Sequence, residues 1–208
     1  MNFNYISNYR PIAELSSVLF YENKLRCANN NVAEAILANL ASDFINDGIH
    51  FTMLSYLVDT QSYKNPSFRA TFNSFGEVTN TGEAEFIGGL CKLFIKLGLS
   101  VNDLGVISVY RYHAERLRRI VQAGIEVNTV DQYQGRDKPI IVLSFVWTGE
   151  TENRKSELLA DCRRINVAIT RAKYKLILVG CQKSLSRYPT VNAVINAIPK
   201  ECVAKLHE

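Results

Sequence analysis

The sequence has no Cys-x-x-Cys pair, and its five cysteines are scattered, at positions 27, 91, 162, 181 and 202. Its three histidines, His50, His113 and His207, show no spacing typical of metal ligands. Isolated cysteines of this kind indicate reduced thiols in an intracellular protein, not a disulfide framework or a zinc site. The sequence therefore predicts no metal site.

Long apolar runs are also missing. No stretch approaches the roughly 20 apolar residues that a membrane span needs, and the N-terminus lacks the charged-then-apolar layout of a signal peptide. Hydrophobic residues make up 47% of the chain and charged residues 21%, which is typical of a soluble globular protein. The length of 208 residues predicts one domain with one sizeable core.

Two patterns that ATP hydrolysis requires are absent. The sequence contains no Gly-x-x-x-x-Gly-Lys-[Ser/Thr] and no apolar run that ends in Asp-Glu. The chain thus lacks the loop that cradles phosphates and the carboxylates that hold magnesium in P-loop enzymes. Any role with ATP would need a second domain to supply both.

Positive charge is concentrated in the second half of the chain. Residues 1–100 carry 7 Lys+Arg and 9 Asp+Glu, whereas residues 101–208 carry 17 and 11, within a total net charge of +4. A basic half suits a polyanionic partner such as nucleic acid or a nucleotide phosphate. Solvated helix faces are the alternative, and charge alone favours them.

The segment 126–180 is the most informative part of the chain. Apolar, β-branched runs at 125–130, 140–146 and 176–179 predict buried strands, and arginines at helical spacing between the last two runs predict a helix. Strands that alternate with helices indicate an α/β fold with a mainly parallel sheet. Ligands of such sheets bind beyond the carboxyl ends of the strands. At that rim we expect five residues, namely Thr129, Gln134, Gly135, Asp137 and Arg171.

The remaining segments predict further scaffold elements. We expect helices at 12–21, 32–40 and 81–97, and a fourth helix that follows residues 110–112 and ends at residue 122. We expect strands at 50–58, 68–72 and 104–109. Thr81 is expected to cap its helix, and Arg116, Arg118 and Arg119 to form a solvated helix face. Residues 189–208 are expected to form a docking helix and a loose tail.

Two long motifs resemble those of a known family. Residues 127–138 read Val-Asn-Thr-Val-Asp-Gln-Tyr-Gln-Gly-Arg-Asp-Lys, and residues 163–173 read Arg-Arg-Ile-Asn-Val-Ala-Ile-Thr-Arg-Ala-Lys. They resemble motifs V and VI of superfamily 1 helicases of the type B branch, and most of all those of the eukaryotic DNA replication ATP-dependent helicase/nucleases. Asn-Tyr-Arg-Pro at 8–11 resembles motif IV, usually Gln-Tyr-Arg-Met. The resemblance implies that residues 1–208 form the second RecA-like domain, a three-layer domain of P-loop NTPase type without its own P-loop.

The resemblance also implies a nucleotide site. Tyr9 would stack on the adenine, Arg10 would reach the terminal phosphates, and Gly135 and Asp137 would line the nucleotide. Arg171 resembles the arginine finger, which stabilises charge on the γ-phosphate and contributes ~10³-fold or more in rate. The bound nucleotide would be ATP with Mg²⁺, whose metal ligands belong to the first RecA-like domain. No acid follows Asp161 until Glu201, so we expect the arginines of this segment to be unpaired, with Arg164 bracing the loop or the domain interface.

A second set of residues would hold nucleic acid, namely Thr129, Ser108, Tyr110, Arg111 and Gln134. Hydroxyls, backbone amides and guanidinium groups can bind a phosphate backbone without reading sequence. We expect single-stranded DNA, with RNA as the alternative. Asp131 has two interpretations, a ligand contact or a hydrogen-bond acceptor within its own loop.

The resemblance implies the C-terminal motor domain of an ATP-dependent 5′-to-3′ DNA helicase of replication or repair. It would act in the nucleus, with the mitochondrion as the alternative compartment, beside the first RecA-like domain of the same or a parent chain. The isolated chain is expected to lack ATPase activity. Three alternatives stay open: a truncated, non-catalytic nucleic-acid-binding domain, a remnant that binds a protein partner, and the equivalent domain of an RNA helicase of the same branch.

Overall fold

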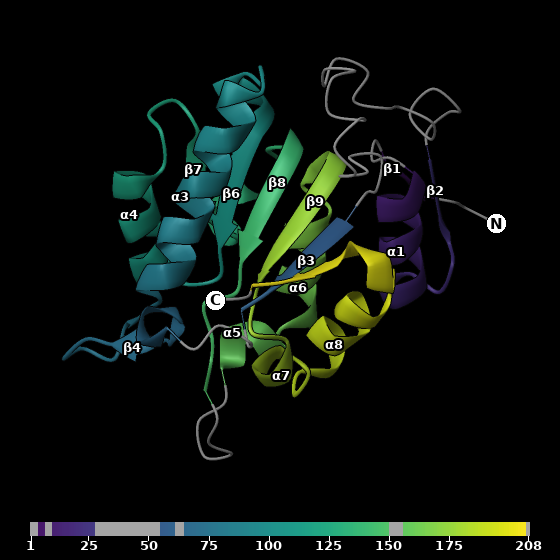
Figure 1. Ribbon diagram of the computed structural model, residues 1–208. Coiled ribbons are helices and arrows are strands. Elements are labelled where there is room, and N and C mark those ends of the chain that lie inside the picture. The colour runs from purple at the N-terminus through teal and green to yellow at the C-terminus, as the bar shows by residue number, and fades with distance from the viewer. Residues whose placement is uncertain (1–3, 7–9, 28–54, 61–64, 150–155, 207–208) are drawn as a thin grey trace.

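A parallel sheet of six strands forms the centre of the protein (Figure 1). The computed structural model describes residues 4–6, 10–27, 55–60, 65–149 and 156–206. The strands lie in the order β10 (Val203–Lys205), β3 (Ser55–Asp59), β9 (Ala172–Gly180), β8 (Lys138–Ser144), β6 (Leu104–Ser108) and β7 (Glu126–Thr129). Two short pairs lie outside this sheet, namely β1 (Asn4–Ile6) with β2 (Leu25–Cys27), and the antiparallel hairpin of β4 (Thr71–Phe72) and β5 (Val78–Thr79).

Helices cover both faces of the sheet. The helices α3 (Thr81–Lys96) and α4 (Arg111–Ile120) lie on one face, and α1 (Arg10–Phe20), α6 (Cys162–Ile169) and α8 (Pro189–Asn196) lie on the other (Figure 1). Alternate strand residues point to opposite faces, so Val142 packs with α3 while Leu143 packs with α6. The result is the predicted α/β, RecA-like arrangement of three layers.

Short elements complete the connections. They are the helices α5 (Glu157–Ala160) and α7 (Gln182–Leu185) and the 3₁₀ turns η2 (Pro66–Phe68), η3 (Val101–Asp103), η4 (Asp131–Tyr133) and η5 (Lys200–Cys202). The expected strands at 104–109, 125–130, 140–146 and 176–179 are confirmed with small shifts of their limits. The helix expected at 32–40 lies outside the described residues, and the strand expected at 50–58 is described only from residue 55.

Three local predictions were wrong. Residues 203–205 are not a loose tail but a strand that pairs with Leu57–Asp59, which gives the backbone of that edge its hydrogen-bond partners. Asn80, not Thr81, caps α3, because its side chain accepts a bond from the backbone N–H of Glu83 at 3.0 Å. Residues 68–72 form no single edge strand, since η2 ends at Phe68 and only two residues enter the hairpin.

The strand register separates two ends of the sheet. Thr129 lies beside Ser108 at the carboxyl ends of β7 and β6, whereas Lys138 lies beside Ala172 at the amino ends of β8 and β9. Asp137 and Arg171 immediately precede those two amino ends. The prediction that they share the carboxyl rim with Thr129 was therefore wrong. A chain that joins two parallel strands of one sheet must return from the carboxyl end to the amino end, and the segment 130–137 makes that return from β7 to β8, past β6.

Candidate functional site

At the amino end of the sheet, Asp137 and Arg171 form an ion pair. The adjacent starts of β8 and β9 bring the two residues together. Arg171 Nη1 donates to Asp137 Oδ1 at 2.7 Å. The side chains are 19% and 27% exposed, so solvent screens the pair only in part.

The end of α6 also holds Arg171. Its Nε donates to the backbone oxygen of Val167 at 3.1 Å, and its Nη2 donates to Thr170 Oγ1 at 3.2 Å. Together with the bond to Asp137, these contacts use three of the five N–H donors of a guanidinium. The group is thus fixed in direction and keeps further donors for an anion.

Arg164 braces the loop that precedes Asp137, as expected. Its Nη2 lies 3.1 Å from Asp131 Oδ2 in η4, and its Nε lies 3.5 Å from Asp161 Oδ2 at the start of α6. Asp131 therefore accepts from α6 and not from within its own loop. The expectation of unpaired arginines was wrong for Arg164 and Arg171, because Asp131 and Asp137 come from a segment that precedes the helix by more than 20 residues in the sequence.

Tyr133 anchors the loop between β7 and β8. Its ring is fully buried, and Gly105 of β6 leaves room for it, since a Cβ at position 105 would lie 2.1 Å from Tyr133 Oη. Two residues later, Gly135 has φ +77°, in the left-handed region that favours glycine. A Cβ there would meet open space, so the backbone conformation and not packing requires glycine. Gln134 and Gly135 are both exposed.

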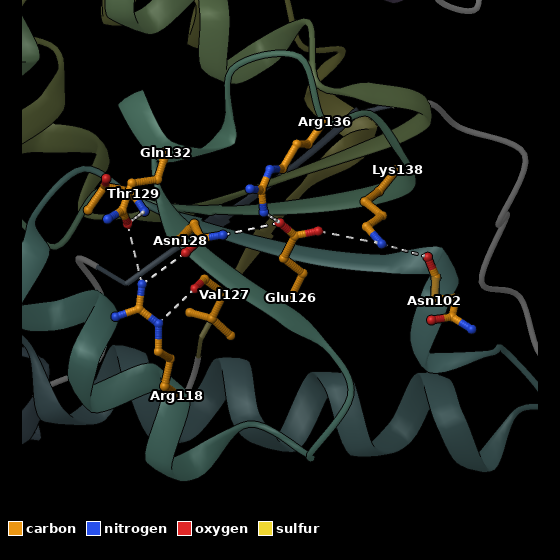
Figure 2. Close-up of polar contacts among 9 residues, drawn as sticks. All are labelled: Asn102, Arg118, Glu126, Val127, Asn128, Thr129, Gln132, Arg136 and Lys138. Carbon is orange, nitrogen blue, oxygen red and sulfur yellow. Dashed lines mark hydrogen bonds and ion pairs between the residues drawn. The ribbon is translucent and has the colours of Figure 1, made fainter.

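A polar network covers the edge strand β7 beside this loop (Figure 2). Arg118 of α4 donates to the backbone oxygen of Val127 at 2.9 Å, to Asn128 Oδ1 at 2.9 Å and to Gln132 Oε1 at 3.4 Å. Gln132 accepts in turn from the backbone N–H of Thr129 at 3.5 Å. The expectation for Arg118 was wrong in part, because this exposed arginine ties α4 to the segment that carries Thr129.

Glu126 forms the second centre of the network (Figure 2). Arg136 Nη1 lies 2.7 Å from Glu126 Oε1, and Lys138 Nζ lies 3.6 Å from Oε2. Partial burial acts to raise the pKa of Glu126, but the two cations outweigh it and lower the pKa below its usual value. The first residue of β7 is thereby linked to the first residue of β8.

Of the three nucleic-acid contacts expected at the end of β6, only Arg111 is accessible. Ser108 is fully buried, and its Oγ donates to the backbone oxygen of Tyr110 at 3.0 Å and accepts from its N–H at 3.1 Å. Tyr110 is 9% exposed, and its hydroxyl donates to Ser156 Oγ. These two side chains therefore build the turn, whereas the side chain of Arg111 is 82% exposed, with Nε 3.2 Å from Glu115.

Sequence reasoning missed a buried group at the same end, which we call the Glu83 clamp (Asn80, Glu83, Ser144 and Val146). Glu83 Oε1 accepts from Ser144 Oγ at 2.6 Å and from the backbone N–H of Val146 at 3.0 Å. Asn80 Nδ2 donates to the backbone oxygen of Val146 at 3.3 Å. Val146 has φ +67°, a strained conformation for a β-branched residue. The only sequence signal was the spacing of Asn80 and Glu83, which by itself indicates a helix cap.

Burial shifts the pKa of two ionisable groups of this region. Burial raises the pKa of Glu83 to about 7, although the hydrogen bonds from Ser144 and Val146 act in the opposite direction. Burial, and then the charge of Arg116, lower the pKa of His113 to about 3. His113 Nδ1 accepts from the backbone N–H of Asn80 at 3.2 Å, which links this histidine to the clamp.

The segment resembling motif IV lies at the margin of the described structure. Tyr9 is outside the described residues, and Arg10 begins α1 without a described side chain. The helix itself is fixed to α6, because Ser16 Oγ donates to Asn166 Oδ1 at 2.8 Å and Asn166 Nδ2 donates to Tyr21 Oη at 2.9 Å.

The part of the chain that the structure describes contains no group of three or more His, Cys, Asp or Glu side chains that could hold a metal ion. Among the described helices, none has both the length and the apolar character needed to cross a membrane.

Comparison with known proteins identifies relatives over most of the chain. The AAA_12 family model, an AAA domain, matches residues 2–183. The DNA replication ATP-dependent helicase/nuclease DNA2 of Bos taurus is 39% identical over 209 residues, which cover 91% of this chain and 19% of the relative. The Homo sapiens DNA2 is 37% identical, with 91% and 19% covered, and the Arabidopsis thaliana helicase/nuclease JHS1 is 34% identical, with 92% and 15% covered.

These relatives confirm the resemblance that the motifs predicted. The chain spans about a fifth of the length of the two animal relatives. Among solved structures, one described as the C-terminal domain of a possible DNA helicase from Lactobacillus plantarum WCFS1 matches 99% of both chains at 10% identity, with a TM-score of 0.49. The strand order and the three layers establish the fold.

Proposed function

We infer, from the premise that the chain belongs to the AAA_12 family of AAA domains, that it is the C-terminal motor domain of an ATP-dependent 5′-to-3′ DNA helicase. Its relatives are named as DNA replication helicase/nucleases, which favours a role in replication or repair in the nucleus and single-stranded DNA as the nucleic acid. The first RecA-like domain, in the same or a parent chain, would supply the phosphate loop and the magnesium ligands.

One observation carries this proposal. The segment 129–137 runs from the carboxyl end of β7 to the amino end of β8, with Thr129 at one end and Asp137 beside Arg171 at the other. A single loop with one anchor, the buried Tyr133, can therefore touch nucleic acid and nucleotide at once. A shift of one end would move the other, which is what a motor needs for coupling.

The amino end would receive the nucleotide. Gly135 and Asp137 would line the ATP, and Arg171, already aimed by Val167 and Thr170, would contact the γ-phosphate. Arg10 would join it at the phosphates and Tyr9 would stack on the adenine. The bond between Ser16 and Asn166 supports this pairing, because it fixes α1, which begins at Arg10, to α6, which ends two residues before Arg171.

The carboxyl end would hold the DNA backbone. Thr129 and Arg111 would bind phosphates, Gln134 would add a contact from the exposed loop that follows Thr129, and the buried Ser108 and Tyr110 would position Arg111. These contacts touch no base edge, so they would grip single-stranded DNA without reading its sequence.

A chimaera tests this function. Residues 1–208 replace the corresponding segment of the human relative, and ATP hydrolysis stimulated by single-stranded DNA is measured. The proposal expects substantial activity, lost by about 10³-fold in Arg171→Ala and kept in Arg163→Ala, an exposed arginine of α6. The purified 208-residue chain alone should hydrolyse no ATP. A chimaera that folds and binds DNA yet gives the same residual rate with and without Arg171 contradicts the proposal.

A non-catalytic nucleic-acid-binding domain is the second candidate. It is favoured by the ion pairs that Arg164 and Arg171 form with acidic residues of this chain. These pairs neutralise both arginines without a bound nucleotide. This candidate expects the chain to bind single-stranded DNA while the chimaera stays inactive. An RNA helicase domain of the same branch would instead give stronger stimulation by single-stranded RNA than by DNA.

A further inference from the structure

The β4–β5 hairpin presents an aromatic ring to solvent at the carboxyl end of the sheet. Phe75 at its tip is 88% exposed, the highest value among the exposed large hydrophobic residues described. The hairpin projects outward beside the lower end of α3, on the side toward which the arrowheads of β8 and β9 point (Figure 1). That side is the carboxyl end, where Thr129 and Arg111 lie.

The tip is rigid. Asn73 Oδ1 accepts from the backbone N–H groups of Phe75 and Glu77, both at 2.9 Å, and Asn73 Nδ2 donates to Glu77 Oε2 at 2.7 Å. Gly76 turns the chain at φ +79°, and its N–H donates to the backbone oxygen of Asn73 at 3.0 Å. A turn with this many bonds fixes the backbone at Phe75, so little backbone entropy is lost when a ligand binds there.

The base of the hairpin is anchored to the carboxyl end by aromatic rings. Phe72 meets the buried Trp147 edge to face, with ring centroids 5.9 Å apart, and Trp147 stacks on Tyr110 at 6.3 Å. Trp147 directly follows the strained Val146 of the Glu83 clamp. A chain of rings therefore connects the turn before Arg111 to the hairpin.

The neighbouring helix carries the charge that nucleic acid requires. Thr79 of β5 lies 3.2 Å from His113 of α4, measured from Oγ1 to Nδ1. The sequence of α4, RYHAERLRRI, holds four arginines and one glutamate. An exposed flat ring beside a basic helix is the combination by which proteins bind single-stranded nucleic acid, with the ring stacking on bases and the cations meeting phosphates.

We propose that the β4–β5 hairpin is a base-stacking site for single-stranded nucleic acid, with the Phe75 ring as the platform on which a base lies. This inference rests on the proposed function and adds a contact outside the motifs. It assigns to the hairpin a base-face contact, whereas Thr129 and Arg111 hold the backbone.

The test measures binding of a fluorescent oligo(dT) to the full chain at low salt. Phe75→Ala should weaken binding about tenfold. Phe75→Trp should preserve it, with its added tryptophan emission quenched by the oligonucleotide, and Phe75→Leu should behave like alanine, because leucine is apolar but not flat. Leu93→Ala, which removes a half-exposed apolar side chain from α3, is the matched control and should bind normally.

The outcomes separate this inference from the proposed function. One outcome overturns the hairpin proposal and leaves the backbone contacts in place. In that outcome the unaltered chain binds oligo(dT) and Arg111→Ala weakens this binding, but Phe75→Ala and Phe75→Leu bind with the affinity of the unaltered chain. Equal affinity of the leucine and tryptophan variants also overturns it, since stacking would then play no part. If the unaltered chain does not bind the oligonucleotide at all, the nucleic-acid grip itself fails, and the hairpin proposal fails with it.

Discussion

The two ends of the sheet use polar groups in opposite ways. At the amino end, partly exposed charges pair with one another, as in Asp137 with Arg171 and Glu126 with Arg136. At the carboxyl end, the buried Glu83 is held by neutral donors and keeps Val146 in a strained conformation. Charges that retain contact with water can exchange partners, whereas buried hydrogen bonds are costly to leave unmade. The amino end is therefore suited to ligand exchange and the carboxyl end to holding a fixed shape.

The largest effect on stability is expected at the carboxyl end. Glu83→Ala leaves a cavity and removes the acceptor of Ser144 and Val146. We expect a loss of about 3–5 kcal/mol in the free energy of unfolding, measured by urea denaturation at pH 6. Glu85→Ala, an exposed acid on the same helix, should change it by about 0.5 kcal/mol or less. Similar losses in both variants would mean that the clamp has no special role.

The clamp should also give stability an unusual dependence on pH. The pKa of Glu83 is raised to about 7 in the folded state, so its contribution is complete below pH 4.5 and is lost as the pH rises to 7. The pKa of His113 is lowered to about 3, so its contribution is complete above pH 6.5 and is lost as the pH falls. The two slopes oppose each other between pH 4.5 and 6.5.

Glu83→Gln separates the two slopes, because it removes that of Glu83 and keeps that of His113. Relative to this variant, the unaltered chain should lose roughly 3 kcal/mol of unfolding free energy between pH 4.5 and 7. Denaturant unfolding across that range measures the difference. Parallel pH profiles of the two proteins would show that Glu83 does not titrate as described.

The packing of the buried Tyr133 ring against Gly105 should be sensitive to the addition of one methyl group. A Cβ in Gly105→Ala would lie 2.1 Å from Tyr133 Oη, so the ring must shift, at about 1–3 kcal/mol of unfolding free energy. Tyr133→Phe removes that oxygen, and the double variant should recover part of the loss. Thermal unfolding of the two single variants and the double variant measures the coupling, and strict additivity of the losses would contradict the packing described.

The smallest effect distinguishes the ion pairs of the two ends. A double-mutant cycle on Arg171 and Asp137 should give a coupling energy of about 1 kcal/mol, because that pair is partly buried. The same cycle on Arg111 and Glu115, exposed and one helical turn apart, should give about 0.3–0.5 kcal/mol. High salt should weaken the second coupling more than the first. Equal couplings would remove the contrast between the ends.

Much of this arrangement could be predicted from local patterns. The apolar runs at 104–109, 140–146 and 176–179 indicate strands because both faces of a central parallel strand are buried. Motif spacing located the loop of Gly135 and Asp137 and the helix before Arg171. The ion pairs of Arg164 and Arg171 could not be predicted, since their partners lie in the segment 131–137, which only the fold brings near.

Other features depend on the tertiary structure alone. That Asp137 lies beside Arg171 follows from the register of β8 and β9, which the sequence next to either residue does not show. Glu83 has the position of an ordinary first-turn acid, and only the packing of β8 against α3 buries it. Val203–Lys205 is too short to show a strand pattern, and it becomes a strand because β3 offers an edge.

The pairing of β10 with β3 has a consequence for synthesis of the chain. Residues 57–59 find their outer neighbour only in residues 203–205, more than 140 positions later. On the ribosome, one border of the growing sheet must therefore wait, with its amides and carbonyls unmatched, until nearly the whole chain has emerged. During that interval a nascent molecule can join another through the same border, and the arrival of β10 reduces this risk, because it leaves an edge strand of only three residues.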